Sequence, residues 1–279
     1  MDPEIQQPQP HQLERHADIG AGRKLRLGIV GQGTPTIVLP PVLGGTIEAW
    51  AGFQASISTL GRSVSYDSPG TPGCSPGALP RTSGTSVDDL HKAFKSEKLG
   101  PPYIFVGYSA GAFDALLFAS RYPGEMEGLI LIDPAIAHMD RRLHPLSPVI
   151  RQADMDEAQG IAADLQKARD AGLAPVEIAR LLNRQSHFSS FFSISSNQIE
   201  EECLSLGSIP LAVRTATQLS VEADNLPAVR AMWWEQHKRY ALLSTRGDHR
   251  EIEGGHNIIV EQPTAVFEIL REMIEETAR

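Results

Sequence analysis

The sequence predicts an α/β fold in which a mostly parallel sheet is flanked by helices. Strand-like apolar runs alternate with helical periodicity along most of the chain, an order typical of parallel strands joined by right-handed crossovers. Runs such as 102–106 and 129–132 are apolar throughout, which indicates strands buried on both faces. The alternation stops between about 135 and 207, where the pattern is purely helical.

The N-terminal elements are expected in the following order. Residues 1–15 are expected to be a disordered tip, because the first ten are polar and rich in proline. A strand follows where Leu25, Leu27 and Ile29 alternate with polar or small residues. The next strand, 36–39, is short and apolar, and it leads into a loop that contains glycine.

The chain then returns to helical spacing. Apolar residues within 47–57 recur with a helical period, and a strand is expected at 62–66. Ser86 and Asp89 resemble a capping pair, which predicts that a helix begins near Ser86 and ends near Leu99.

The remaining elements complete one core. A strand at 102–106 precedes a helix at 110–122, and the strand at 129–132 ends at Asp133. After the helical stretch, the pattern predicts a strand at 209–213, a helix near 230–243, a strand at 249–253 and a final helix from about Pro263. The predicted organisation is therefore an α/β core of residues 16–134 and 208–279, with a helical cap formed by residues 135–207.

Composition excludes several classes of protein. The chain has 279 residues, of which 41% are hydrophobic, so it can build a large core without a metal or disulfide. Its net charge of -9 and the lack of a basic run argue against nucleic-acid binding. We find no signal peptide and no apolar stretch of the ~20 residues that cross a bilayer, so we expect a cytoplasmic protein without a membrane partner. The sequence leaves a homodimer open.

One motif indicates chemistry. The strand at 102–106 runs into Gly107-Tyr108-Ser109-Ala110-Gly111, and a helix begins at once. This is the G-x-S-x-G pattern in the strand–turn–helix context that gives it meaning. The sharp turn projects the serine hydroxyl away from the sheet, and bulk at either flanking glycine would clash. The Ala110 amide at the helix N-terminus would stabilise an oxyanion, so Ser109 is the predicted nucleophile.

A serine nucleophile needs a general base, and nine histidines are available. His256 follows a strand and two glycines and precedes the last helix. That position places it at the carboxyl end of the sheet, on the same edge as Ser109. His256 is therefore the predicted base. His138, His144 and His187 fall in the cap, where they could line a pocket.

Five segments together resemble the α/β-hydrolase family, namely 36–50, 65–67, 103–111, 129–134 and 254–263. The resemblance implies an eight-stranded, mostly parallel sheet with the cap inserted after the sixth strand. It also implies a Ser-His-acid triad that needs no cofactor. A second oxyanion donor is implied on the loop after the third strand, which corresponds to the Leu43 amide. The sequence departs from the family there, because Pro41-Val42 replaces the usual His-Gly.

The resemblance offers two positions for the triad acid. One subset of the family places it at the end of the sixth strand, where Asp133 lies. Most members place it after the seventh strand, where the first carboxylates are Glu222 and Asp224. We favour Asp133, with Asp224 and then Glu222 as alternatives.

The cap contains the densest aromatic patch of the chain, at Phe188, Phe191 and Phe192. Pocket lining and core packing explain it equally well. If these residues line the pocket, the small-molecule substrate has an apolar part, and an ester or lactone cleaved through an acyl-enzyme is expected from family frequency.

Rival interpretations are a ligand receptor with slow turnover, or a carbon–carbon bond hydrolase, lyase or acyltransferase. Dehalogenases and epoxide hydrolases of this fold use a carboxylate where this chain has Ser109. No ligand spacing for a metal is present.

Overall fold

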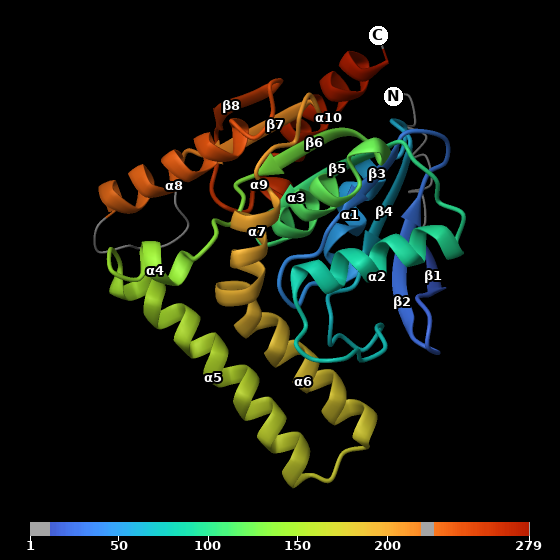
Figure 1. Cartoon of the computed structure of the whole chain (residues 1–279), viewed down its shortest axis with the longest axis vertical. Coiled ribbons are helices and arrows are strands. Elements are labelled where there is room, and N and C mark those ends of the chain that lie inside the picture. The colour runs from blue at the N-terminus through green and yellow to red at the C-terminus, as the bar shows by residue number, and fades with distance from the viewer. Residues whose placement is uncertain (1–11, 219–225, 279) are drawn as a thin grey trace, which may run out of the picture.

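An eight-stranded sheet forms the centre of the protein (Figure 1). The computed structural model describes residues 12–218 and 226–278. The strand order is β1-β2-β4-β3-β5-β6-β7-β8, with antiparallel pairing of β2 to β1 and β4 and parallel pairing elsewhere. The predicted α/β fold with a mostly parallel sheet is confirmed. The strands are β1 (Leu13–Asp18), β2 (Lys24–Val30), β3 (Thr36–Leu39), β4 (Arg62–Tyr66), β5 (Tyr103–Tyr108), β6 (Met126–Ile132), β7 (Leu211–Ala216) and β8 (Gly247–Ile252).

Helices cover both faces of the sheet and form the cap (Figure 1). They are α1 (Ala51–Ser56), α2 (Ser83–Ser96), α3 (Gly111–Arg121), α4 (Met139–Leu143), α5 (Pro148–Asp170), α6 (Pro175–Ser190), α7 (Ser196–Glu202), α8 (Leu226–Ala241), α9 (Ile258–Glu261) and α10 (Pro263–Thr277). Short 3₁₀ turns occupy Ile47–Trp50 and Pro123–Glu125, and a π-helical turn, Phe191–Ser195, joins α6 to α7.

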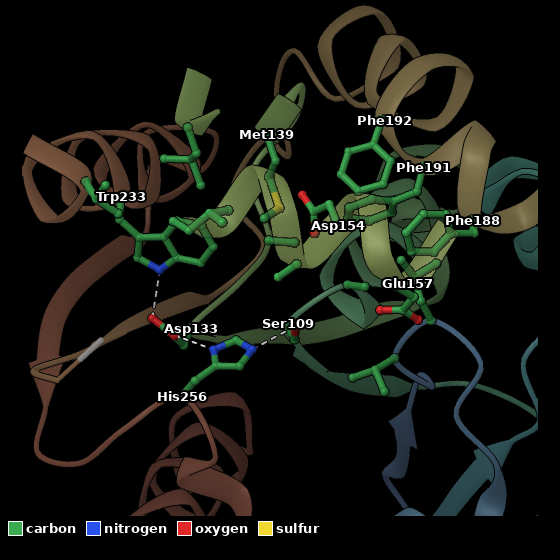
Figure 2. Close-up of a pocket in the computed structure, with 18 residues that line it drawn as sticks. Ser109, Asp133, Met139, Asp154, Glu157, Phe188, Phe191, Phe192, Trp233 and His256 are labelled. Atoms are coloured by element: carbon green, nitrogen blue, oxygen red, sulfur yellow. Dashed lines mark hydrogen bonds and ion pairs between the residues drawn. The ribbon is translucent and has the colours of Figure 1, made fainter. Parts of the chain in front are cut away.

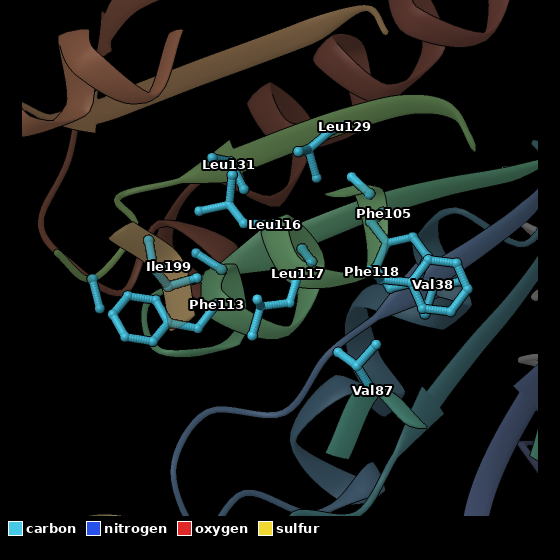
Figure 3. Packing of buried hydrophobic residues seen from close by; sticks show 14 of the residues in the cluster. Val38, Val87, Phe105, Phe113, Leu116, Leu117, Phe118, Leu129, Leu131 and Ile199 are labelled. Carbon is cyan, nitrogen blue, oxygen red and sulfur yellow. The ribbon is translucent and has the colours of Figure 1, made fainter. Parts of the chain in front are cut away.

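The continuous apolar runs are explained by two separate cores, one on each face of the sheet. Along β5, Phe105 packs on the side covered by α2, α3 and α8, where it meets Phe118 (Figure 3). Its neighbours Ile104 and Val106 pack on the other side, against α1 and α10. Because successive side chains of a strand point to opposite faces, a strand buried on both sides must be apolar at every position.

The first strand begins earlier in the chain than the sequence predicts. Residues 13–15 were expected to be disordered, but they belong to β1, which pairs along its whole length with β2. Ala17 is the only buried residue of this edge strand. The alternation of apolar residues that identifies a strand is therefore missing. Arg26 on β2 instead forms an ion pair with Glu14 across the pair of strands.

The start of α2 also differs from the prediction. The helix begins at Ser83, and Thr82 caps it by a reciprocal pair of hydrogen bonds with Thr85. Asp89 therefore lies inside the helix and does not cap it. Its buried carboxylate accepts hydrogen bonds from Arg23 at 2.7 and 2.8 Å and from Arg81 at 2.9 Å. These two guanidinium groups explain why an acidic residue stands at position 89. A local sequence pattern cannot reveal such partners.

The cap lies between β6 and β7, within the predicted segment 135–207, and consists of α4 to α7. In Figure 1, α5 and α6 form a hairpin that extends away from the sheet, whereas α7 lies against the core near α3. The cap is anchored by Phe191, whose ring stacks on Phe113 of α3 with a centroid distance of 4.6 Å. Within residues 12–218 and 226–278, no helix has the length and apolar character needed to cross a membrane.

Asp114, on α3, offers a test of how the core responds to pH. Its carboxyl is 4% exposed and accepts a hydrogen bond from the Tyr66 hydroxyl at 2.7 Å. Burial raises the pKa of this carboxyl to about 7, although the hydrogen bond with Tyr66 opposes the shift. In the unfolded chain, the pKa returns to about 4. The folded protein therefore keeps a proton that the unfolded chain releases, and the free energy of unfolding falls as the pH rises from about 4 to 7.

We expect Asp114→Asn to raise the free energy of unfolding by about 2–4 kcal/mol at pH 8 and to change it little at pH 4. The amide keeps the acceptor for Tyr66 but carries no charge to bury. Urea denaturation at both pH values measures the difference, with the exposed Asp156→Asn as a charge-matched control. Equal destabilisation by Asp114→Asn at the two pH values would show that the native carboxyl is ionised.

Candidate active site

The turn between β5 and α3 holds Ser109 in a strained backbone conformation. Its φ angle is +51°, in the left-handed region that residues with a side chain rarely adopt. Both flanking glycines are required by close packing. A Cβ atom at Gly107 would lie 2.8 Å from the Cα of Ala112, and one at Gly111 would lie 2.7 Å from the carbonyl oxygen of Pro40. The predicted clash of bulkier residues is thus accounted for by two specific contacts.

The structure brings Ser109, His256 and Asp133 together at the carboxyl edge of the sheet (Figure 2). His256, between β8 and α9, has its Nε2 atom 3.0 Å from the Ser109 Oγ. Its Nδ1 atom lies 2.6 Å from Oδ2 of Asp133, which directly follows β6. The alternative acids Asp224 and Glu222 lie outside the described residues.

The environment of Asp133 fixes the proton positions in this group. The carboxyl is 2% exposed, and burial raises its pKa, but the hydrogen bond and charge of His256 lower it further, so the net pKa lies below the ordinary value. Asp133 is therefore ionised at neutral pH and can only accept hydrogen bonds. It follows that Nδ1 of His256 carries the proton in the bond to Asp133, and in the neutral ring this tautomer directs the lone pair of Nε2 at the hydroxyl of Ser109.

Two more groups donate to the same carboxylate. Trp233 of α8 donates from Nε1 to Oδ1 of Asp133 at 2.9 Å, and the amide of Ala216 donates to that oxygen at 3.1 Å (Figure 2). The carboxylate thus receives three donors, which compensate for the water it has lost. Sequence reasoning missed Trp233, because a tryptophan in a helical pattern carries no sign of a partner 100 positions earlier.

A buried histidine supports the backbone next to Asp133. His237 lies one helical turn after Trp233, and its Nε2 donates to the carbonyl of Pro134 at 2.7 Å. Burial lowers the pKa of His237 to about 4, against the opposing charge of Asp133, so the ring is neutral. Its Nδ1 then accepts from the hydroxyl of Thr215 at 2.7 Å. The sequence analysis did not single out His237, and it missed this role.

The two predicted oxyanion donors line the cavity in front of Ser109. Ala110 is the residue directly before α3, and Leu43 lies on the loop after β3. Among the described residues, neither backbone amide donates a hydrogen bond to another protein group. Despite the Pro41-Val42 sequence, Leu43 thus lines the same cavity as Ser109, and its N–H bonds to no other residue in the described part of the chain.

The histidines of the cap lie outside this group. His144 pairs with Asp154 at 2.8 Å and His138 with Glu200 at 3.3 Å, while His187 is buried. None of the three lines the cavity beside Ser109, contrary to the prediction that they could. Within the part of the chain that the structure describes, no cluster of three or more His, Cys, Asp and Glu side chains could hold a metal ion.

A mostly apolar cavity of about 330 Å³ opens over Ser109 and His256. Phe188, Phe191 and Phe192 form part of its wall, as Figure 2 shows. Because Phe191 also stacks on α3, the two explanations of the aromatic patch, pocket lining and core packing, both hold for that residue. The other lining residues are Val42, Leu43, Ala110, Asp133, Ala135, Met139, Leu143, Ile150, Ala153, Asp154, Glu157, Val229 and Trp233.

The sheet order, the turn at Ser109 and the helical cap together are the architecture of an α/β hydrolase. The chain matches the alpha/beta hydrolase family over residues 37–269, and it belongs to that family. It is 23% identical over 237 residues to the uncharacterized protein YqjL of Bacillus subtilis (strain 168), a match that covers 85% of this chain and 82% of that protein.

Solved structures of this fold include proteins of different activity. The chain resembles the enol-lactonase of Burkholderia xenovorans LB400, with a TM-score of 0.63 and 18% identity over 93% of this chain and 99% of that one. It also resembles the haloalkane dehalogenase DatA of Agrobacterium tumefaciens C58, with a TM-score of 0.69 and 15% identity over 96% and 97% of the two chains. At this identity, the likeness shows the fold alone, so the reaction must be argued from the site.

Trp233 both lines the cavity and donates to Asp133, and the two roles can be separated. Trp233→Phe keeps an aromatic wall but removes the N–H donor. We expect kcat to fall about tenfold or more, since a hydrogen bond to a charged group is lost, while KM changes little. Val229→Ala, on the same helix and cavity wall but without a hydrogen bond to Asp133, should change mainly KM. Steady-state kinetics on one ester gives both constants, and an unchanged kcat in Trp233→Phe would contradict the positioning role.

Proposed function

We propose that this protein is a serine hydrolase that cleaves a small-molecule ester or lactone with an apolar moiety through an acyl-enzyme intermediate. One observation carries the proposal. The chain of hydrogen bonds from Asp133 through His256 to Ser109 ends at a hydroxyl that faces an apolar cavity. An imidazole held in this tautomer by a buried carboxylate is suited to accept the serine proton.

The reaction follows from these positions. Ser109 Oγ attacks the carbonyl carbon of the ester while its proton passes to Nε2 of His256, and Asp133 stabilises the imidazolium. The negative charge forms on the carbonyl oxygen, where the amides of Ala110 and Leu43 would donate to it. Collapse of this intermediate breaks the bond to the alcohol, which takes the proton from His256. Water then attacks the acyl-enzyme, with His256 again as base, and releases the acid and Ser109.

The apolar moiety of the ester or lactone is supported by the wall of the cavity. Most of the described residues that line it are apolar, which suits an alkyl or aryl group. The likeness to an enol-lactonase is compatible with this choice. The most informative screen combines p-nitrophenyl esters of graded chain length with a panel of lactones. Turnover separates an enzyme from a receptor that keeps a slow triad.

The nucleophile is tested by Ser109→Ala. Alanine fits the turn but cannot form the acyl bond, so we expect kcat to fall by at least ~10³ and labelling by a fluorophosphonate probe to disappear. The circular dichroism spectrum should stay native. A Ser109→Ala variant that is folded and fully active would contradict the serine-hydrolase proposal.

The acid is tested by a pair of substitutions. Asp133→Asn keeps the shape of the side chain but removes the charge and favours the wrong tautomer of His256, so we expect a loss of about 10³–10⁴ in kcat. Asp224→Asn should stay within roughly tenfold of the wild type, because a carboxylate that is not bonded to His256 acts only through a screened field. Both are measured on the same chromogenic ester after a thermal melt confirms folding. An inactive Asp224→Asn beside an active Asp133→Asn would reassign the acid.

A further inference from the structure

The charged side chains on the cavity wall all have the same sign. Apart from the residues bonded to one another in the triad, Asp154 and Glu157 are the ionisable groups among the described residues that line it, and both come from α5 (Figure 2). No lysine or arginine is among these lining residues. Besides the triad, the described wall of this mostly apolar cavity therefore carries two carboxylates and no lysine or arginine.

The two carboxylates differ in their partners. Asp154 is half-buried and is bonded to Nε2 of His144, which lies outside the cavity lining, at 2.8 Å. Glu157 forms no ion pair or side-chain hydrogen bond with any residue in the described part of the chain. Glu157 lies within one helical turn of Asp154, so both face the same wall. Glu157 is exposed, and a ligand that fills the cavity would cover part of its carboxylate, where a positive group would compensate for the water displaced.

The aromatic residues of the cavity favour the same kind of group. Phe192 packs against both other phenylalanines of the cavity wall, with ring-centroid distances of 5.4 Å to Phe188 and 5.3 Å to Phe191. Trp233 lies on the other side of the cavity in Figure 2. The faces of such rings attract cations, and an alkylated ammonium group combines that charge with an apolar surface.

We propose that the substrate carries an alkylated ammonium group, so that this protein hydrolyses cationic esters or lactones in preference to neutral ones and excludes anionic ones. The inference rests on the proposed function and names the substrate class for it. The ammonium group would lie between the phenylalanine rings and the carboxylates of Asp154 and Glu157, and the scissile carbonyl would lie at Ser109. A carboxylate on the substrate would meet repulsion from both acids.

The test uses three p-nitrophenyl esters that share a leaving group and a chain length. The first has an acyl chain that ends in trimethylammonium, the second has tert-butyl in its place, and the third ends in a carboxylate. We expect the wild type to hydrolyse the cationic ester with kcat/KM at least about tenfold above that of its neutral isostere. The anionic ester should be the poorest substrate of the three.

Variants that remove one charge distinguish the selectivity of the pocket from the intrinsic reactivity of the esters. Glu157→Gln should lower the cationic-to-neutral ratio of kcat/KM about fivefold to tenfold. Asp154→Asn should lower it less, because His144 already bonds to that carboxylate at 2.8 Å. Asp156→Asn is the matched control, since Asp156 is an exposed acid on the same helix that does not line the cavity. The intrinsic reactivity of each ester is the same for all variants, so it cancels from the comparison.

Binding to Ser109→Ala makes the result independent of turnover. Calorimetric titration with the corresponding ethyl esters should give a dissociation constant about tenfold lower for the cationic than for the neutral ester, and Glu157→Gln in the same background should remove the difference. Equal affinities, or a preference that Glu157→Gln does not change, would overturn the proposed substrate class. If the cation is preferred in binding but the wild type hydrolyses no ester, the hydrolase proposal fails and the cationic pocket stands.

Discussion

An ionised carboxylate that is 2% exposed can persist only where hydrogen bonds replace its water, and Asp133 obtains three of them from distant parts of the chain. The donors come from the end of β7, from α8 and from the loop between β8 and α9. The parallel order β6-β7-β8 brings the carboxyl ends of these strands to one edge, so a single buried charge ties them together. Loss of any donor would leave this charge less compensated. The imidazole of His256 is one of the three donors, and its bond to Asp133 holds the ring in one orientation.

The proposed nucleophile, Ser109, depends on the same edge of the sheet. The amide of Ser109 donates to the carbonyl of Ile132 at 3.2 Å, and the carbonyl of Ser109 accepts from the amide of Ala135 at 2.9 Å. These two bonds attach the turn to the residues on either side of Asp133. The left-handed φ angles of +51° at Ser109 and +39° at Asp133 are therefore stabilised together, because each strained residue lies in the hydrogen-bonded frame of the other. The positions of Ser109 and Asp133 relative to each other are therefore set by backbone bonds, without contact between their side chains.

The sequence predicted the parts of this arrangement that local patterns encode. Apolar runs identified β5 and β6, since burial on both faces leaves no polar position, and the glycines around Ser109 identified the turn. The pattern could not reveal β1, which is stabilised by backbone pairing and by ion pairs such as Glu14 with Arg26. Nor could it reveal Trp233 and His237, whose partners are carboxyl and carbonyl groups brought close only by the sheet order. Long-range polar contacts have no signature in a single sequence.

The groups proposed for reaction and for selectivity come from parts of the protein with different packing. Ser109 and Asp133 directly follow the mostly buried strands β5 and β6, and His256 follows the edge strand β8, which pairs with the buried β7. The acids of α5 belong to a helix of which only Ile150, Ile161, Leu165 and Ala168 are buried. Substitution of Asp154 or Glu157 therefore disturbs few packed atoms, whereas substitution near Asp133 removes support for a buried charge. It follows that the ligand preference of the cavity can change through the cap while the hydrogen-bonded group at the sheet edge stays intact, which is how one core can accommodate different substrates.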